Sequence, residues 1–220
     1  MCFNSPMLDA FLFPAADGQS TRTMIVLHGL GDSARGYTWL PGALGLKDMN
    51  YILVNAPDEY YMGYSWYDYE GDPAPGVERS RKALLELISA LETDGRTTDE
   101  IFLFGFSQGC LVAIDVAARS KEVFAGVMGI SGKVFEPEQL IQDASDAGRK
   151  QRFLVTHGDN DPVIPIETTR PQIQMLRDAG FQIDWREFRK EHGFAEPEEI
   201  DAIRNFLDGR PEEIFGRLES

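Results

Sequence analysis

A serine between two glycines is the strongest chemical signal in the chain. The pentapeptide Gly105-Phe106-Ser107-Gln108-Gly109 has the form G-x-S-x-G and lies between an expected strand, residues 101–104, and an apolar helical segment, residues 110–118. In this setting the backbone turns sharply, the serine hydroxyl is left exposed, and the helix N-terminus supplies positive potential and free N–H groups. The pattern predicts that Ser107 is a nucleophile of covalent catalysis.

A serine hydroxyl is a weak nucleophile, so a base must lie within hydrogen-bond reach. The chain offers three histidines. The chain order at such an elbow is serine, acid, histidine, which excludes His28 because it precedes Ser107. His157 does not fit this order, because no acidic residue at the end of a strand lies between Ser107 and His157 in the chain. His192, which follows the last expected strand at residues 182–188, is therefore the predicted base.

The carboxylate that orients the base is expected in the loop after strand 153–156, which reads HGDNDPVIP from residue 157. Asp159 and Asp161 are both candidates by position, and both are also favoured turn residues. A metal site formed by His157 and these aspartates is disfavoured, because no further cluster of ligands accompanies them and a metal would make the elbow redundant. The residues alone leave the choice of aspartate open.

A second glycine-rich segment, HGLGD at residues 28–32, follows the expected strand 24–27. Acyl transfer through a tetrahedral intermediate needs N–H donors aimed at the developing negative oxygen. With this type of elbow, one donor follows the nucleophile and the other comes from the loop after an early strand. We therefore assign an oxyanion hole to the backbone N–H groups of Leu30 and Gln108. An ordinary glycine turn is the alternative for residues 28–32.

The elements that must position these residues follow from apolar patterning. Short runs rich in β-branched and aromatic residues are expected to be strands, at residues 8–13, 24–27, 51–54, 101–104, 124–130, 153–156 and 182–188. Their weak alternation is typical of parallel strands buried on both faces. Helical spacing marks residues 77–91, 110–118 and 200–207. The alternation predicts an α/β fold with a mostly parallel central sheet and helices on both faces, as one domain over residues 1–220.

Residues 56–76 interrupt this alternation and hold three prolines and five of the seven tyrosines. Long loops in compact domains are often lids or binding loops. We expect Trp66 and Tyr67 to contact substrate, with packing as the alternative, because aromatic side chains also anchor long loops. Whether the segment acts as a lid is left open.

The chain is acidic, since 21 Lys and Arg against 36 Asp and Glu give a formal charge of −15 over 220 residues. This charge excludes a role in binding nucleic acid and disfavours an anionic membrane face. No stretch approaches the roughly 18 apolar residues of a membrane span, and two cysteines are too few for a disulfide framework. We expect a cytoplasmic protein without integral membrane contact, for which a homodimer is a possible state.

Together these motifs resemble the phospholipase/carboxylesterase family of α/β-hydrolases, which includes bacterial carboxylesterases, acyl-protein thioesterases and lysophospholipases. The matching pieces, in the family's order, are HGLGD at 28–32, SWYD at 65–68, GFSQG at 105–109, ISG at 130–132 and HGDNDPVIP at 157–165. The resemblance spans most of the chain. It implies a triad of Ser107, Asp161 and His192, an oxyanion hole from Leu30 and Gln108, and no metal or organic cofactor.

The residues around His192 depart from the family pattern. Arg189, Lys190 and Glu191 precede it and Gly193-Phe194 follows, where apolar and then small residues are typical. This departure leaves the acyl-chain and leaving-group preference open. Cys110 also stands where a small residue is usual, and we expect it to be a buried helix residue.

The sequence therefore predicts a serine carboxylesterase that hydrolyses short- to medium-chain or aryl esters through an acyl-enzyme, with thioesters and lysophospholipids as further candidate substrates. The expected partner is a small-molecule ester. An acyl-protein thioesterase or an amidase is the alternative. A scaffold that only binds is a further alternative, which the presence of all three triad candidates disfavours.

Overall fold

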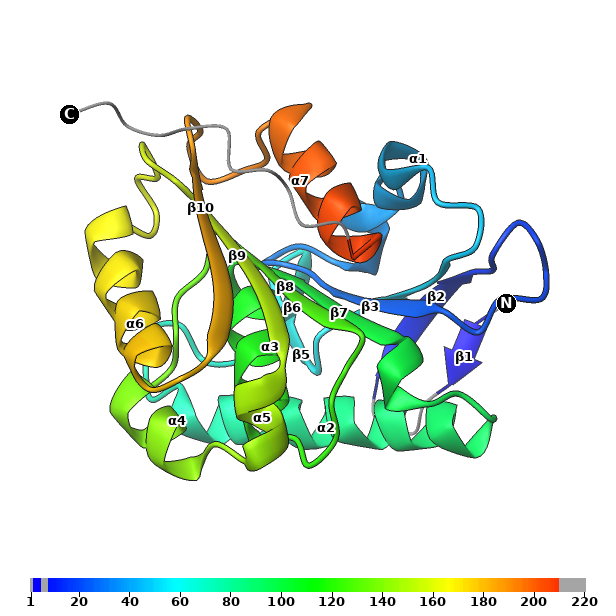
Figure 1. The fold of residues 1–220 in the computed structure, drawn as a ribbon, viewed down its shortest axis with the longest axis horizontal. Helices are drawn as coiled ribbons and strands as arrows, with labels where there is room; N and C mark the ends of the chain where they lie inside the picture. The colour runs from blue at the N-terminus through cyan, green and yellow to red at the C-terminus, as the bar shows by residue number, and fades with distance from the viewer. Residues whose placement is uncertain (1, 5–7, 210–220) are drawn as a thin grey trace.

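One eight-stranded sheet forms the centre of the computed structural model, which describes residues 2–4 and 8–209 (Figure 1). The strand order across the sheet is β1-β2-β4-β3-β7-β8-β9-β10. Strand bounds are Cys2–Asn4 (β1), Asp9–Phe13 (β2), Thr23–Leu27 (β3), Asn50–Val54 (β4), Ile101–Phe106 (β7), Gly126–Ile130 (β8), Arg152–Gly158 (β9) and Gln182–Phe188 (β10). The β1–β2 and β2–β4 pairs are antiparallel and the remaining pairs are parallel. The prediction of a mostly parallel sheet is confirmed.

Helices cover both faces of this sheet (Figure 1). Their bounds are Leu40–Leu44 (α1), Ala74–Thr93 (α2), Gln108–Arg119 (α3), Pro137–Asp143 (α4), Asp146–Lys150 (α5), Ile166–Asp178 (α6) and Glu198–Leu207 (α7), with 3₁₀ turns at Ala34–Tyr37 and Thr98–Glu100. Helices α2, α3, α4 and α6 pack on one face, and α1 and α7 on the other. None of the helices in the described part of the chain combines the length and apolar character needed to cross a membrane.

Strand β3 shows how the two faces are filled. Ile25 and Leu27 pack into the core under α2 and α3, whereas Met24 and Val26 pack into the core under α1 and α7. All five residues of this strand are buried, as they are in β4 and β8. Successive side chains point to opposite faces, so a strand covered on both sides is apolar along most of its length. This explains the weak alternation in the sequence.

The structure differs from the sequence prediction in residues 56–76, which are not one continuous loop. Asp58–Tyr60 (β5) and Gly63–Ser65 (β6) form an antiparallel hairpin, and α2 begins at Ala74. The prolines at 73 and 75 that suggested a loop lie at the start of α2, where a missing N–H leaves no bond unmade. Helix α6 was also unpredicted, since Pro171 inside it weakens the helical signal.

Candidate active site

Ser107 lies at the junction of β7 and α3 with φ 54° and ψ −113°. A positive φ is strained for a residue with a Cβ, and such strain is concentrated at functional sites. A Cβ added to Gly105 would lie 2.1 Å from the Gly109 carbonyl oxygen, and one added to Gly109 would lie 2.3 Å from the Leu27 carbonyl oxygen. Both glycines are therefore needed to pack β3, the turn and α3 this closely.

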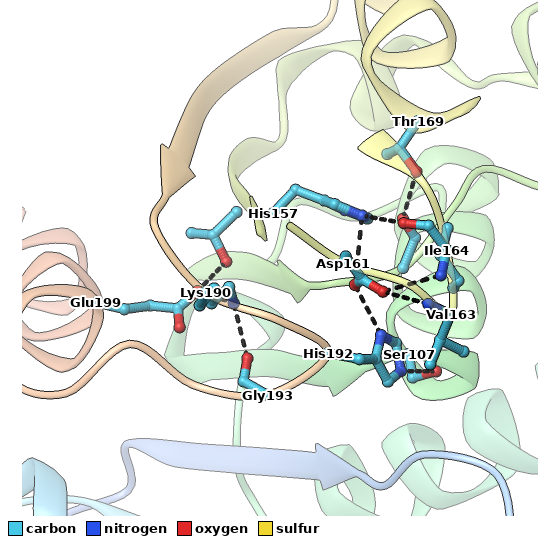
Figure 2. Close-up of polar contacts among 12 residues, drawn as sticks. Ser107, His157, Asp161, Val163, Ile164, Thr169, Lys190, His192, Gly193 and Glu199 are labelled. Atoms are coloured by element: carbon cyan, nitrogen blue, oxygen red, sulfur yellow. Dashed lines mark hydrogen bonds and ion pairs between the residues drawn. The ribbon is translucent and has the colours of Figure 1, made fainter. Parts of the chain in front are cut away.

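Ser107, His192 and Asp161 form one hydrogen-bonded chain, although they come from three separate loops at the carboxyl ends of β7, β10 and β9 (Figure 2). His192 Nε2 lies 2.9 Å from Ser107 Oγ, and His192 Nδ1 lies 2.7 Å from Asp161 Oδ2. With the imidazole proton on Nδ1, Nε2 accepts the serine hydroxyl. This is the arrangement in which a base activates a serine and a carboxylate orients the base.

The structure also separates the two candidate acids. Asp161 is buried, and its Oδ1 accepts the N–H groups of Val163 and Ile164 at 2.9 Å each. Burial raises the pKa of the Asp161 carboxyl, but the hydrogen bonds from Ile164, His192 and Val163 outweigh it and hold that pKa below its ordinary value. Asp159 is exposed, and its Oδ1 accepts the side-chain amide of Asn160. Asp161 is thus the carboxylate that stays ionised against the imidazole.

The segment 28–32 lies directly against the nucleophile. A Cβ on Gly29 would lie 3.3 Å from Ser107 Cβ and 3.0 Å from the Phe106 ring. Leu30 follows this contact, and Gln108 is the first residue of α3, where a backbone N–H has no partner within the helix. The fold therefore brings the segment that holds Leu30 next to the serine, and the oxyanion hole formed by Leu30 and Gln108 stays a prediction.

The side chain of Gln108 has a second set of contacts, which the sequence did not indicate. Its Oε1 accepts the N–H of Trp66 at 3.0 Å and the hydroxyl of Ser65 at 3.2 Å, and its Nε2 donates to the Tyr67 carbonyl at 3.0 Å. The residue after the nucleophile thus binds the segment that follows the β5–β6 hairpin.

The two predicted substrate contacts, Trp66 and Tyr67, both lie inside the fold. Trp66 has no exposed surface, and its indole N–H donates to the His28 carbonyl at 2.9 Å. Tyr67 is also buried. These contacts match the packing alternative, because each ring fills the core beside α2. The exposed aromatic side chains of this segment are Tyr61, at the hairpin tip, and Tyr69.

The remaining histidines, His28 and His157, form hydrogen bonds with the backbone of the loops at the site. His28 Nδ1 donates to the Gly29 carbonyl at 2.6 Å, and its Nε2 accepts the N–H of Ala56 at 3.0 Å, which fixes a neutral ring under the Leu30 loop. His157 Nε2 lies 2.8 Å from the Ile164 carbonyl oxygen and 3.6 Å from Asp161 Oδ2. Burial lowers the pKa of both imidazoles.

The residues that the structure describes contain no group of three or more His, Cys, Asp or Glu arranged to hold a metal ion. Cys110 lies within α3 without exposed surface, and burial raises the pKa of its thiol to about 12. Because the thiolate is the reactive form, this side chain is a packing group as expected.

A parallel sheet, a strained serine at a strand-to-helix turn and a histidine after the last strand define the α/β-hydrolase fold class. A solved structure, esterase PE8, has the same fold, with a TM-score of 0.79 at 26% identity over 92% of this chain and 98% of that one. Acyl-protein thioesterase 1 of Gibberella zeae is 26% identical over 93% of this chain and 96% of its own. Its counterpart in Cryptococcus neoformans is 33% identical over 71% and 73%.

The family model described as Phospholipase/Carboxylesterase matches residues 11–209. The chain belongs to the phospholipase/carboxylesterase family of α/β-hydrolases, and it is an enzyme that acts on ester bonds. The resemblance carried by the sequence motifs is confirmed.

Proposed function

We propose that the protein is a serine carboxylesterase that hydrolyses small carboxylic esters, with Ser107, His192 and Asp161 as its triad. The observation that supports this most strongly is the unbroken hydrogen-bonded chain from the Ser107 hydroxyl to the Asp161 carboxylate. The strained turn at Ser107, the N-terminus of α3 and the close approach of Gly29 accompany it. Each of these features has a defined task in acyl transfer.

In the proposed mechanism, His192 Nε2 takes the proton from Ser107 Oγ as this oxygen attacks the ester carbonyl carbon. The N–H groups of Leu30 and Gln108 stabilise the oxyanion of the tetrahedral intermediate. The intermediate collapses, and His192 returns the proton to the departing alcohol. Water then attacks the acyl-enzyme by the same steps, which releases the carboxylic acid and restores Ser107.

The first test is hydrolysis of p-nitrophenyl esters of increasing acyl length by the wild-type protein and by Ser107→Ala. We expect the substitution to lower kcat on the order of 10⁴- to 10⁶-fold, because no other group attacks the carbonyl. Ser89→Ala, at an exposed serine on α2, is the matched control and should leave kcat unchanged. Equal turnover by wild type and Ser107→Ala would exclude the proposed nucleophile.

Thioester hydrolysis is the second candidate function, and the names of the curated relatives favour it, since both are acyl-protein thioesterases. The same triad serves both reactions, and a thiolate leaves with less help from a proton donor than an alkoxide does. A direct comparison is kcat/KM for an acyl thioester and an oxygen ester of the same acyl chain. A p-nitroanilide with that acyl group tests the amidase alternative.

A small, uncharged ester is the substrate we propose, because the acidic surface attracts neither polyanions nor anionic lipid. We also place the protein in the cytoplasm. The free thiol of Cys110 is compatible with that reducing compartment.

A further inference from the structure

A buried ion pair lies behind the loop that carries His192 (Figure 2). Lys190 Nζ is 2.6 Å from Glu199 Oε1, and the two side chains are 4% and 0% exposed. Burial lowers the pKa of the Lys190 ammonium, and the adjacent Glu199 carboxylate opposes this change. Desolvation makes buried pairs poor sources of stability, and an apolar pair of similar volume often stabilises a fold as well. The pair therefore calls for an explanation other than stability.

The Lys190 side chain spans the segment of the loop that contains His192. Its Nζ also donates to the Gly193 carbonyl at 2.9 Å, so the side chain closes a ring that contains His192 (Figure 2). The backbone carbonyl of Lys190 accepts the N–H of Asn160, next to Asp161, at 3.2 Å. One residue thus links the loop of the base to the loop of the acid.

Glu199 fixes the other end of the same loop. Its Oε2 accepts the N–H of Ala195 at 2.9 Å, and its Oε1 accepts the hydroxyl of Thr156, which lies in β9 just before the acid loop. Glu199 lies in the first turn of α7, where a negative charge is favourable. The carboxylate therefore ties α7, β9 and the His192 loop into one unit.

We propose that Lys190 and Glu199 are positioning residues of the catalytic base, holding the His192 imidazole in line with Ser107 and Asp161 through both acyl transfers. This inference rests on the proposed function. The imidazole must keep two hydrogen bonds while its charge appears and disappears, and a misplacement of about 1 Å can cost 10²-fold in rate. The 190–195 loop belongs to no helix or strand, and the side-chain bonds of Lys190 and Glu199 add to its few backbone hydrogen bonds, such as that from the Gly193 N–H to the Glu191 carbonyl.

The test is the double variant Lys190→Met/Glu199→Gln, which removes both charges and keeps an acceptor for the Ala195 N–H. We expect a folded protein whose urea midpoint is near that of wild type. Its kcat for a p-nitrophenyl ester should fall about 10- to 100-fold, with KM within about twofold. We expect wild type to give a low-field proton NMR signal from His192 Nδ1–H, and the variant to broaden or lose it.

The matched control is Arg170→Gln/Glu187→Gln, which removes an exposed ion pair between α6 and β10. It should change neither kcat nor the NMR signal. A folded Lys190→Met/Glu199→Gln variant with kcat within twofold of wild type and an unchanged signal would overturn the inference. So would a fall in kcat matched by an equal loss of folded protein, which is the result of a purely structural role.

If the double variant does not fold, Glu199→Gln alone provides the test. The amide keeps one acceptor oxygen, removes the charge and replaces the second acceptor oxygen by an NH2 donor. We expect kcat to fall at least fivefold; an unchanged kcat contradicts the inference. The wild-type assay separates the two proposals. Failure of Ser107-dependent turnover removes the proposed function, whereas normal wild-type turnover with unaffected Lys190 and Glu199 variants removes only the positioning role.

Discussion

Gln108 illustrates how much a single residue of this site does. Its backbone N–H lies at the start of α3 as a proposed oxyanion donor, and its side chain makes three hydrogen bonds with residues 65–67. The amide is buried, as are the groups that it binds. Removing it leaves the buried Trp66 N–H without a partner, and such a group carries the full cost of desolvation. The Tyr67 carbonyl keeps one hydrogen bond, from the Ser65 hydroxyl at 2.7 Å.

We therefore predict that Gln108→Leu is destabilised by roughly 1–3 kcal/mol, since the buried Trp66 N–H loses its partner. Urea unfolding measures this change in the free energy of unfolding. Gln139→Leu is the control, because Gln139 is an exposed residue of α4 with one hydrogen bond to Asp143. If both variants unfold at the same urea concentration, the Gln108 side chain does not hold the 65–67 segment.

At the scale of elements, the site depends on the close approach of β3, the elbow and α3. The backbone of Gly109 faces the Leu27 carbonyl oxygen, and Gly29 faces Ser107. A methyl group on Gly109 would require a shift of the backbone, and one on Gly29 would require a shift of the Phe106 ring. The 28–32 segment and Ser107 are therefore fixed relative to each other by backbone packing and not only by side-chain bonds.

Gly109→Ala should accordingly reduce thermal stability and abolish esterase turnover, because its Cβ would meet the Leu27 carbonyl oxygen at 2.3 Å. Gly42→Ala in α1 is the matched substitution, since a Cβ there meets nothing within 4 Å. Alanine at position 42 should stabilise the protein slightly, by about 0.5–1 kcal/mol. Calorimetry and the ester assay compare the two variants; comparable melting temperatures would contradict the packing argument.

For the whole molecule, two buried histidines link stability to pH. Burial lowers the pKa of His28 and of His157, so each remains neutral in the folded state at a pH where the unfolded chain already binds a proton. The stability that depends on these neutral imidazoles is fully present above the pKa of an unfolded histidine, about 6.5. It is lost as the pH falls toward their lower pKa in the folded state. Asp161 acts in the same direction but only at the lower pH where carboxylates titrate.

We predict that the free energy of unfolding falls between about pH 7 and pH 5, as measured by urea titration. The high negative charge is partly neutralised over the same range, which opposes this fall, so the measurement belongs at about 0.3 M salt, where surface charges are screened. His157→Gln should flatten the slope. A wild-type slope of zero, or an unchanged slope in the variant, would contradict the assignment of buried neutral histidines.

Much of the fold and of the candidate site could be predicted from sequence because the signals are local. Apolar runs buried on both faces mark the parallel strands, and G-x-S-x-G between strand and helix marks the turn at Ser107. Chain order then leaves His192 as the candidate base. The strand and turn signals depend on neighbours within a few residues, and the candidate base follows from the order of motifs along the chain. The amino-acid order alone therefore determined the fold class and the candidates for the triad.

Only the tertiary structure decided which way side chains point and what lies beside them. It placed Trp66 in the core, as the packing alternative has it, and it brought Gln108 to a segment about 40 residues away in the chain. It also paired Lys190 with Glu199 beside the loop that carries His192. Local patterns do not encode such contacts, because they arise when the sheet brings the ends of separate strands together and burial selects the partners.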